Sequence, residues 1–285
     1  MRMSKKRLTS PPVLAAGKKP LLPALLLVLI VAGCLCCELF IPYDPAYMDL
    51  AHASEGPSRQ FLFGTDTMGR DIFSMIWYGG RISLTIGLLA TAVSALLAVL
   101  IGACSGLAPR WLDGLIMRLT EIILSVPNLL LVVLLQALWQ QAGVLSISLV
   151  IGLTSWMSIA KVVRTEVRQL VHCDYVLASR CMGGGFFHIV ARHLAPNFFS
   201  SIMFMVTMNI RGAIVAESTL SFLGIGLPLE IISWGSMLSL TENSLLAGCW
   251  WIIVIPGLFL IATLMCITEL GERLRGGLSR RHSNL

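Results

Sequence analysis

Two charged side chains inside one long apolar stretch are the first candidates for chemistry in this chain. Arg211 and Glu217 lie within residues 198–224, a stretch long enough to cross a membrane as a helix. A charge at the centre of a bilayer costs about 2.5–3.5 kcal/mol on insertion scales, so each side chain is expected to face other helices or water. Their six-residue spacing places them about 240° apart around a helix, which argues against an ion pair between them.

Arg211 has two possible roles on this pattern. It either faces a wet path between helices, where it meets a carboxylate of a substrate or of a partner subunit, or it forms a structural pair within the bundle. Glu217 is expected to anchor the external end of its helix, because the polar residues Ser218 and Thr219 follow it. We keep both Arg211 and Glu217 as candidates for the path.

Hydroxyl groups mark residues 142–160 as the second candidate region. Such side chains either join helices by hydrogen bonds or line a wet path, and both roles remain open. Ser155 and Ser158 are taken as candidates for the path. The hydroxyl side chains of this stretch are Ser146, Ser148, Thr154, Ser155 and Ser158.

Signals for an enzyme or a metal site are weak. The chain has no glycine-rich loop ending in Lys and Ser or Thr, so it is not expected to bind ATP in the P-loop manner. One group of His and Cys residues lacks the paired spacing of zinc sites. We therefore expect no catalytic residue, no metal ligand and no cofactor on this chain. The residues of that group are His172, Cys173, Cys181, His188 and His193.

The composition indicates a helical membrane protein with several spans. Of the 285 residues 56% are hydrophobic and only 13% are charged, and the mean hydropathy is +0.83. Apolar runs of about 18 residues or more fit a hydrocarbon core of about 30 Å. The sequence predicts six transmembrane helices in an all-α membrane domain, 21–275. The predicted spans are 21–41, 83–107, 122–141, 142–160, 198–224 and 246–268.

The basic residues predict that both termini are cytoplasmic. With the N-terminus inside, only Arg59, Arg70 and Arg81 fall outside and Arg211 falls within a span, as the positive-inside rule requires. The cytoplasmic tails are then 1–20 and 276–285. The net charge of +6 reflects this topology and contact with anionic lipid, and we do not infer nucleic-acid binding from it.

An external segment of about 40 residues, 42–81, separates the first two spans. Asp66 and Asp71 bracket a Gly-Arg pair, which suggests turns with side-chain caps and then a helix that leads into the second span. The segment is interpreted either as a solvated structural loop or as part of a gate for substrate.

A polar segment, 161–197, is predicted to form a cytoplasmic hairpin that docks another protein. Asp174 can cap a short helix, Tyr175 to Met182, and Gly183 stands where a helix commonly stops in a left-handed conformation. A second helix must end near Ala195, because Pro196 disfavours helical geometry in the residue before it. Small and aromatic side chains would supply the contacts. The residues assigned to docking are Asp174, Tyr175, Leu177, Ala178, Ser179, Gly183, Phe186 and Pro196.

The string from Asp174 to Arg180 with Gly183, followed by residues 192–197, resembles the coupling motif of permease subunits of ATP-binding cassette importers. Leu177 stands at the Glu position of that motif and Ser179 at its second Ala. Three other segments, 62–71 with 82–87, 217–226 and 233–237, resemble the dipeptide, oligopeptide and nickel branch of these importers, specifically the second of its two permeases.

This resemblance implies a type I importer permease in the bacterial cytoplasmic membrane. Its implied partners are a homologous permease, two cytoplasmic ATPases that hold ATP and Mg, an external solute-binding protein and membrane lipid. The implied cargo is a small peptide or a nickel or metallophore complex. The alternative is a stand-alone proton-coupled transporter in which Arg211, Glu217 and Glu121 relay protons.

Overall fold

The structure, a computed structural model, describes residues 21–139, 143–171, 173, 179, 181–183, 185, 195–228, 230–239 and 248–282, without the side chains of residues 21, 195–201 and 276–282. The regular elements of these residues are helical. In chain order they are α1 (Leu21–Leu35), the 3-10 helices η1 (Cys37–Leu39) and η2 (Leu50–His52), α2 (Ile72–Leu107), α3 (Arg110–Leu124), α4 (Asn128–Trp139), α5 (Val144–Ser155), α6 (Met157–Leu170), α9 (Ala195–Phe222), α10 (Trp234–Ser239) and α12 (Trp251–His282).

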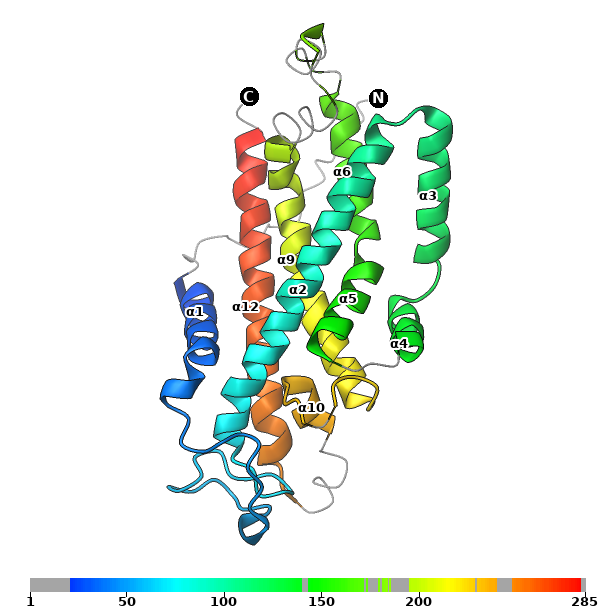
Figure 1. Ribbon diagram of the computed structural model, residues 1–285. Coiled ribbons are helices and arrows are strands. Elements are labelled where there is room, and N and C mark those ends of the chain that lie inside the picture. The colour runs from blue at the N-terminus through cyan, green and yellow to red at the C-terminus, as the bar shows by residue number, and fades with distance from the viewer. Residues whose placement is uncertain are drawn as a thin grey trace, which may run out of the picture.

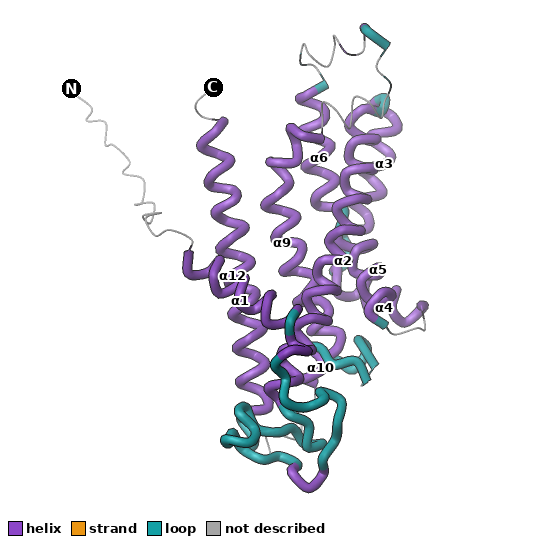
Figure 2. Tube along the Cα trace, turned by 60° about the vertical axis from the view of Figure 1, so that its left-hand side comes forward, coloured by secondary structure: helices purple, strands orange, loops and turns teal. Residues whose placement is uncertain are grey.

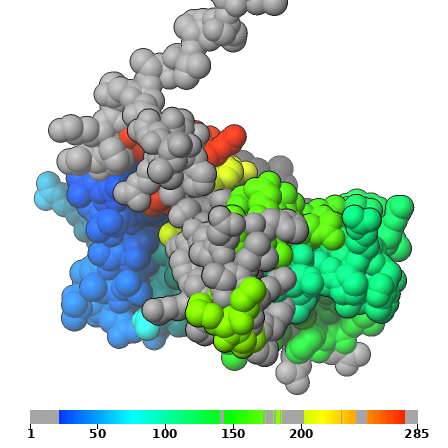
Figure 3. Space-filling model, turned by 90° about the horizontal axis from the view of Figure 1, so that it is seen from above, coloured from blue at the N-terminus to red at the C-terminus, as the bar shows by residue number. Residues whose placement is uncertain are grey.

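Helix α2 is the central element of the bundle. It packs against α5, α6 and α9, and α9 packs in turn against α12 (Figure 1). Helix α1 lies against α2 and α12, on the opposite side of the molecule from α3 and α4 (Figures 1 and 3). The α3–α4 arm therefore lies at the edge of the bundle, and α4 rests on α5.

Close helix contacts explain why small residues recur along α2. A Cβ atom on Gly102 would lie 2.6 Å from the carbonyl oxygen of Ala160 in α6. A Cβ atom on Gly152 of α5 would lie 2.9 Å from the carbonyl oxygen of Ala90 in α2. Because glycine lets two backbones approach this closely, these positions allow α5 and α6 to pack closely against α2.

The second predicted span begins earlier than the sequence indicated. Helix α2 starts at Ile72 and runs for 36 residues, so its length of about 54 Å exceeds the hydrocarbon core of about 30 Å. Asp71 caps it, because its carboxylate accepts hydrogen bonds from the Ser74 backbone N–H at 2.9 Å and the Ser74 hydroxyl at 2.6 Å. The predicted cap and leading helix are confirmed, and residues 72–81 belong to α2.

The third and fourth predicted spans are bent helix pairs. Helices α3 and α4 meet at 89°, and α4 starts directly after Pro127, whose missing N–H and ring interrupt a helix. The expected kink or helix start at Pro127 is confirmed. Helices α5 and α6 meet at 47° around Trp156. The hydroxyls of Thr154 and Ser155 donate to the carbonyl of Ile151, a back-bonding pattern that bends helices.

Length and composition identify fewer spans than predicted among the described residues. Helix α2 and the part Trp251–Arg275 of α12 qualify alone, and each bent pair could form one more span, which gives two to four. The apolar part of α1, Leu22–Leu35, is shorter than a span requires. Helix α9 carries Arg211 and Glu217, which lower its apolar character.

The polypeptide has two distinct ends along the bundle. Residues 42–71, which connect α1 to α2, lie at one end together with the start of α12 (Figures 1 and 2). The corner between α2 and α3, the end of α6 and the end of α12 lie at the other end (Figure 1). We call these the loop end and the corner end.

The segment of residues 42–71 is an ordered structure rather than an extended linker. The Asp66 carboxylate accepts backbone N–H bonds from Met68 at 2.9 Å and Arg70 at 2.8 Å, which confirms the predicted capped turn. Thr65 donates to the carbonyl of His52, and its own carbonyl accepts from Trp251 Nε1 at 3.2 Å. These bonds fix the segment to the start of α12.

Candidate functional site

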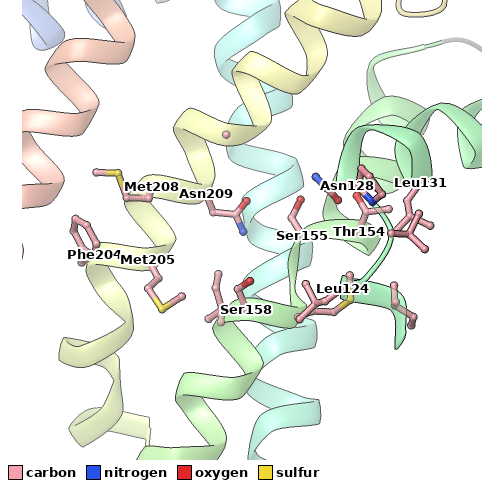
Figure 4. A pocket seen from close by; sticks show the side chains of 16 residues that line it. Leu124, Asn128, Leu131, Thr154, Ser155, Ser158, Phe204, Met205, Met208 and Asn209 are labelled. Carbon is pink, nitrogen blue, oxygen red and sulfur yellow. The ribbon is translucent and has the colours of Figure 1, made fainter. Parts of the chain in front are cut away.

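A cavity of about 520 Å³ opens where both helix breaks meet α9. The α3–α4 turn forms one wall, the α5–α6 break forms the second and the middle of α9 forms the third (Figure 4). Its volume lies within the range of about 300–1,000 Å³ that is typical of small-molecule sites. The lining residues are Ile123, Leu124, Val126, Pro127, Asn128, Leu131, Thr154, Ser155, Met157, Ser158, Ile159, Phe204, Met205, Met208, Asn209 and Gly212.

The cavity is lined by neutral groups. None of the described residues that line it carries an ionisable side chain. Hydroxyls and amides can donate and accept hydrogen bonds, and methionine side chains adapt to ligands of different shape. This lining suits a neutral or amide-rich solute that is held without strong selectivity.

Two of the four residues predicted for a path lie in this cavity. Ser155 and Ser158 face α9, and Asn209 points from α9 toward Ser155 (Figure 4). The Asn209 amide donates to the Ser94 hydroxyl of α2 at 2.7 Å, so the position of Asn209 is fixed by a helix outside the cavity. The side chain of Ser158 is exposed on the surface of the single chain.

Arg211 lies outside the cavity lining. Its side chain is exposed, and its Nη1 atom donates to the Thr268 hydroxyl of α12 at 3.3 Å. It forms no ion pair with Glu217 among the described residues, as the spacing predicted. A partner subunit or a solute can still reach this exposed guanidinium.

Glu217 is fully buried, with 0% of its surface exposed. Its Oε1 atom accepts hydrogen bonds from Ser233 at 2.7 Å and Ser221 at 3.0 Å. Its Oε2 atom accepts from Ser83 of α2 at 3.1 Å and from Ser218 at 3.4 Å. The carboxylate therefore joins α9, α2 and the start of α10, which supports the anchoring role and does not fit exposure to a path.

A second buried carboxylate, which the sequence reasoning missed, joins α3 to α6. Asp113 Oδ2 accepts from Arg164 Nη2 and from Arg168 Nη2, each at 2.6 Å. Asp113 Oδ1 accepts from the Ser105 hydroxyl of α2 at 2.6 Å. We call these four residues the Asp113 clamp. An acidic residue between basic Arg110 and Arg118 was the available signal.

Only part of the predicted docking hairpin belongs to the described residues. Ser179 is buried, and Gly183 has φ +84°, the left-handed conformation that the sequence predicted. Pro196 lies in the first turn of α9, where proline is tolerated. The remaining predicted docking residues, Asp174, Tyr175, Leu177, Ala178 and Phe186, lie outside the described residues, as do His172, His188 and His193 of the weak metal signal.

The described residues contain no group of three or more His, Cys, Asp or Glu side chains that could hold a metal ion.

Ser146, another hydroxyl residue of the stretch 142–160, caps α5, since its Oγ accepts a hydrogen bond from the Gly143 N–H at 2.9 Å. The hydroxyls of this stretch that line the cavity are therefore those next to the α5–α6 break, Thr154, Ser155 and Ser158.

Relatives of the chain are transport permeases. The chain is 35% identical to the dipeptide transport system permease protein DppC of Bacillus subtilis, over 83% of this chain and 74% of the relative. It is 34% identical to the oligopeptide transport system permease protein OppC of the same organism, over 92% and 86%. It is 30% identical to the glutathione transport system permease protein GsiD of Pectobacterium atrosepticum, over 89% and 84%.

A solved structure shares the fold. The inward-facing MetNI methionine ABC transporter contains a chain that matches with a TM-score of 0.56 and 15% identity, over 72% of this chain and 96% of that chain. Residues 96–277 match the family described as binding-protein-dependent transport system inner membrane component. The chain therefore belongs to this family of bacterial inner-membrane, multi-pass transport permeases.

Proposed function

We propose that the chain forms half of the translocation path for small peptides in an ATP-binding cassette importer. The relatives that are 30–35% identical are permeases named for dipeptides, oligopeptides or glutathione. A nickel complex is not favoured by any of these names. Peptide is therefore the cargo that the comparisons support.

The neutral cavity is the observation that carries this proposal. Peptides of different sequence share their backbone amides, and hydroxyl and amide side chains such as Ser155, Ser158 and Asn209 can exchange hydrogen bonds with any of them. Met205 and Met208 can adapt to variable side chains. A lining without fixed charges imposes no choice of cargo charge.

We further propose six spans with both termini in the cytoplasm. The spans are α1, α2, α3 with α4, α5 with α6, α9 and α12. In this topology the corner end is cytoplasmic and the loop end is external. Basic residues at the corner end support it, because Arg110 begins α3 at the α2–α3 corner and Arg168 lies in the last turn of α6.

The energy would come from two ATPases, which hold ATP and Mg, at the corner end. A homologous permease would complete the path and an external solute-binding protein would deliver the peptide. Residues 174–186 and Pro196 would receive the ATPase movement, and α6 and α9, which flank this segment, would carry it to two of the three walls of the cavity. Two rigid helices on either side of one cavity would thus convert nucleotide binding into opening and closing.

Uptake of radiolabelled dialanine by cells that carry the full importer tests the proposal. We expect uptake to stop when the partner ATPases carry a substitution in their nucleotide site, and to continue when a protonophore collapses the proton gradient. The opposite pair of results would identify a proton-coupled transporter and overturn the proposal. An Arg211→Gln variant in the same assay tests whether Arg211 acts on the path.

A further inference from the structure

A second, smaller cavity lies at the loop end, about 220 Å³ in volume. Three methionines and one isoleucine form its apolar part, and a hydroxyl and two opposite charges form its polar part. It lies between the external segment, the first turn of α2 and the start of α10. Its lining is Met48, Met68, Arg70, Met75, Glu230, Ile232 and Ser236.

Arg70 is the unusual member of this lining. Only 5% of its side chain is exposed, and its Nε donates to Asp66 Oδ2 at 2.7 Å. Arginine has five N–H donors, and the hydrogen bonds of the described residues use only Nε of this side chain. Asp66 pairs with this guanidinium through Nε alone, so the terminal nitrogens can still donate hydrogen bonds to a second acceptor.

Glu230 supplies the opposite charge. It lines the same cavity and is exposed, yet it forms no ion pair with Arg70 among the described residues. The guanidinium and the carboxylate therefore line the same cavity without forming a salt bridge with each other. The unused terminal donors of Arg70 and the carboxylate of Glu230 are complementary to a ligand that carries one charge of each sign.

We propose that this cavity is an external subsite for a small zwitterion of amino-acid or dipeptide size, with its carboxylate on Arg70 and its ammonium on Glu230. The volume lies below the range of about 300–1,000 Å³ that suits drug-sized ligands, which favours a ligand of this size. Met48, Met68 and Met75 can adapt to different side chains. The inference rests on the proposed peptide cargo and adds an entry site to it.

The test uses the full chain in lipid nanodiscs with 13C-methyl methionine, and a Met68→Leu variant assigns the Met68 signal. The probes are dialanine, N-acetyl-dialanine, which lacks the ammonium, and dialanine amide, which lacks the carboxylate. We expect dialanine to shift the Met68 signal with an affinity roughly threefold to tenfold above that of either blocked probe, as the net worth of a single hydrogen bond predicts.

Variants then connect each preference to one residue. Glu230→Gln should remove the preference for dialanine over the N-acetyl probe and keep the preference over the amide. Arg70→Lys should weaken the preference over the amide. The controls are Arg59→Gln and Glu55→Gln, which alter exposed residues of the same charges in the external segment. They should change neither the preference over the N-acetyl probe nor the preference over the amide. Because Glu230 is exposed, its substitution leaves the fold intact even if Arg70 variants unfold the segment.

The inference is overturned if dialanine leaves the Met68 signal unchanged, or if Glu230→Gln keeps the full preference over the N-acetyl probe. These results are separate from the proposed function. If Met68 responds as expected but uptake of dialanine does not depend on the ATPases, the subsite stands and the importer proposal fails. If uptake is ATP-driven and the Met68 signal does not respond, the importer proposal stands and the subsite fails.

Discussion

The Glu217 centre and the main cavity use the same hydroxyl chemistry in opposite ways. Around Glu217, hydroxyls from α2, from α9 and from Ser233, the residue before α10, converge on one carboxylate and so connect separate elements. At the cavity, the hydroxyls of Thr154 and Ser155 donate to carbonyls of their own helix. The first arrangement joins helices, whereas the second satisfies the hydroxyls and leaves the helices independent.

This difference indicates which end of the bundle can move. The loop end is held by the Glu217 centre and by Trp234, whose Nε1 donates to the Ile76 carbonyl at 3.0 Å. Helix α3 is held mainly by the Asp113 clamp, since it makes few other contacts, whereas α4 rests on α5. We expect the loop end to act as a fixed support and the cavity walls to move against it.

The largest expected effect is on the Glu217 centre. Glu217→Ala removes the common acceptor of four buried hydroxyls, so it should lower the free energy of unfolding by about 3 kcal/mol or more. Thermal melting of the purified chain in detergent measures this. Glu272→Ala, an exposed glutamate on α12, is the control and should leave the melting temperature nearly unchanged. Equal melting temperatures of the two variants would contradict the claim that the Glu217 centre holds the loop end as a fixed support.

A substitution in the cavity lining should reduce transport and leave the stability of the chain nearly unchanged. Ser158→Leu removes a hydroxyl and places a larger apolar side chain in the lining, and a loss of about 1.4 kcal/mol in interaction with the passing peptide predicts a loss of uptake of about tenfold. Dialanine uptake and melting temperature, measured together, check this. Thr165→Leu on α6 is the matched control, because Thr165 is exposed and does not line the cavity. Normal uptake by Ser158→Leu would place the path elsewhere.

The Asp113 clamp should show an intermediate effect. Asp113→Asn keeps the shape but removes the charge that holds Arg164 and Arg168, which are themselves partly exposed, so we expect a loss of about 1–2 kcal/mol in unfolding free energy. Chemical denaturation measures it. Glu121→Gln loses only ion pairs of 3.8 Å and 4.0 Å at the surface and should be neutral. A neutral Asp113→Asn would mean that α3 is held by packing alone.

The smallest expected effect concerns pH at the loop end. His52 Nδ1 lies 2.8 Å from Asp49 Oδ2, and this hydrogen bond raises the pKa of His52 and lowers the pKa of Asp49. The His52 contribution is present below its ordinary pKa of 6.5 and is lost as pH rises through the raised pKa. The Asp49 contribution is lost as pH falls through the lowered pKa of that carboxyl.

Melting temperatures of the chain and of His52→Gln, compared between about pH 5 and pH 9, check this linkage. We expect the small advantage of the native chain at the acid end of this range to vanish at the alkaline end. An advantage that grows with pH would contradict the assigned direction of the His52 pKa.

Much of the membrane architecture follows from apolar runs, because lipid requires helices of a set length. The capped turn at Asp66 and the interruption at Pro127 were also predictable, since each depends on local residue chemistry. The α5–α6 break was missed because Thr154 and Ser155 fit either of two roles. Only the structure shows that their hydroxyls bond within the helix.

The residues of the site were predictable only in part. Ser155 and Ser158 were found from hydroxyl enrichment, but the contribution of α9 and the α3–α4 turn depends on contacts distant in sequence. Glu217 shows why charge alone is insufficient. A buried carboxylate can serve a path or hold helices together, and the positions of Ser83 and Ser233, both far away in sequence, distinguish these roles.

Distances between spin labels in the assembled importer test the central claim most directly. One pair, at Leu130 of α4 and Leu258 of α12, spans the α3–α4 arm and the bundle, and the other, at Leu62 and Trp250, spans the loop end; all four side chains are exposed. The accessible cysteines, Cys36, Cys104, Cys173 and Cys181, are replaced first. ATP binding should change the first distance by roughly 2 Å or more and leave the second unchanged. A shift of the loop-end pair, or no shift of the arm, would contradict a fixed support with a moving cavity wall.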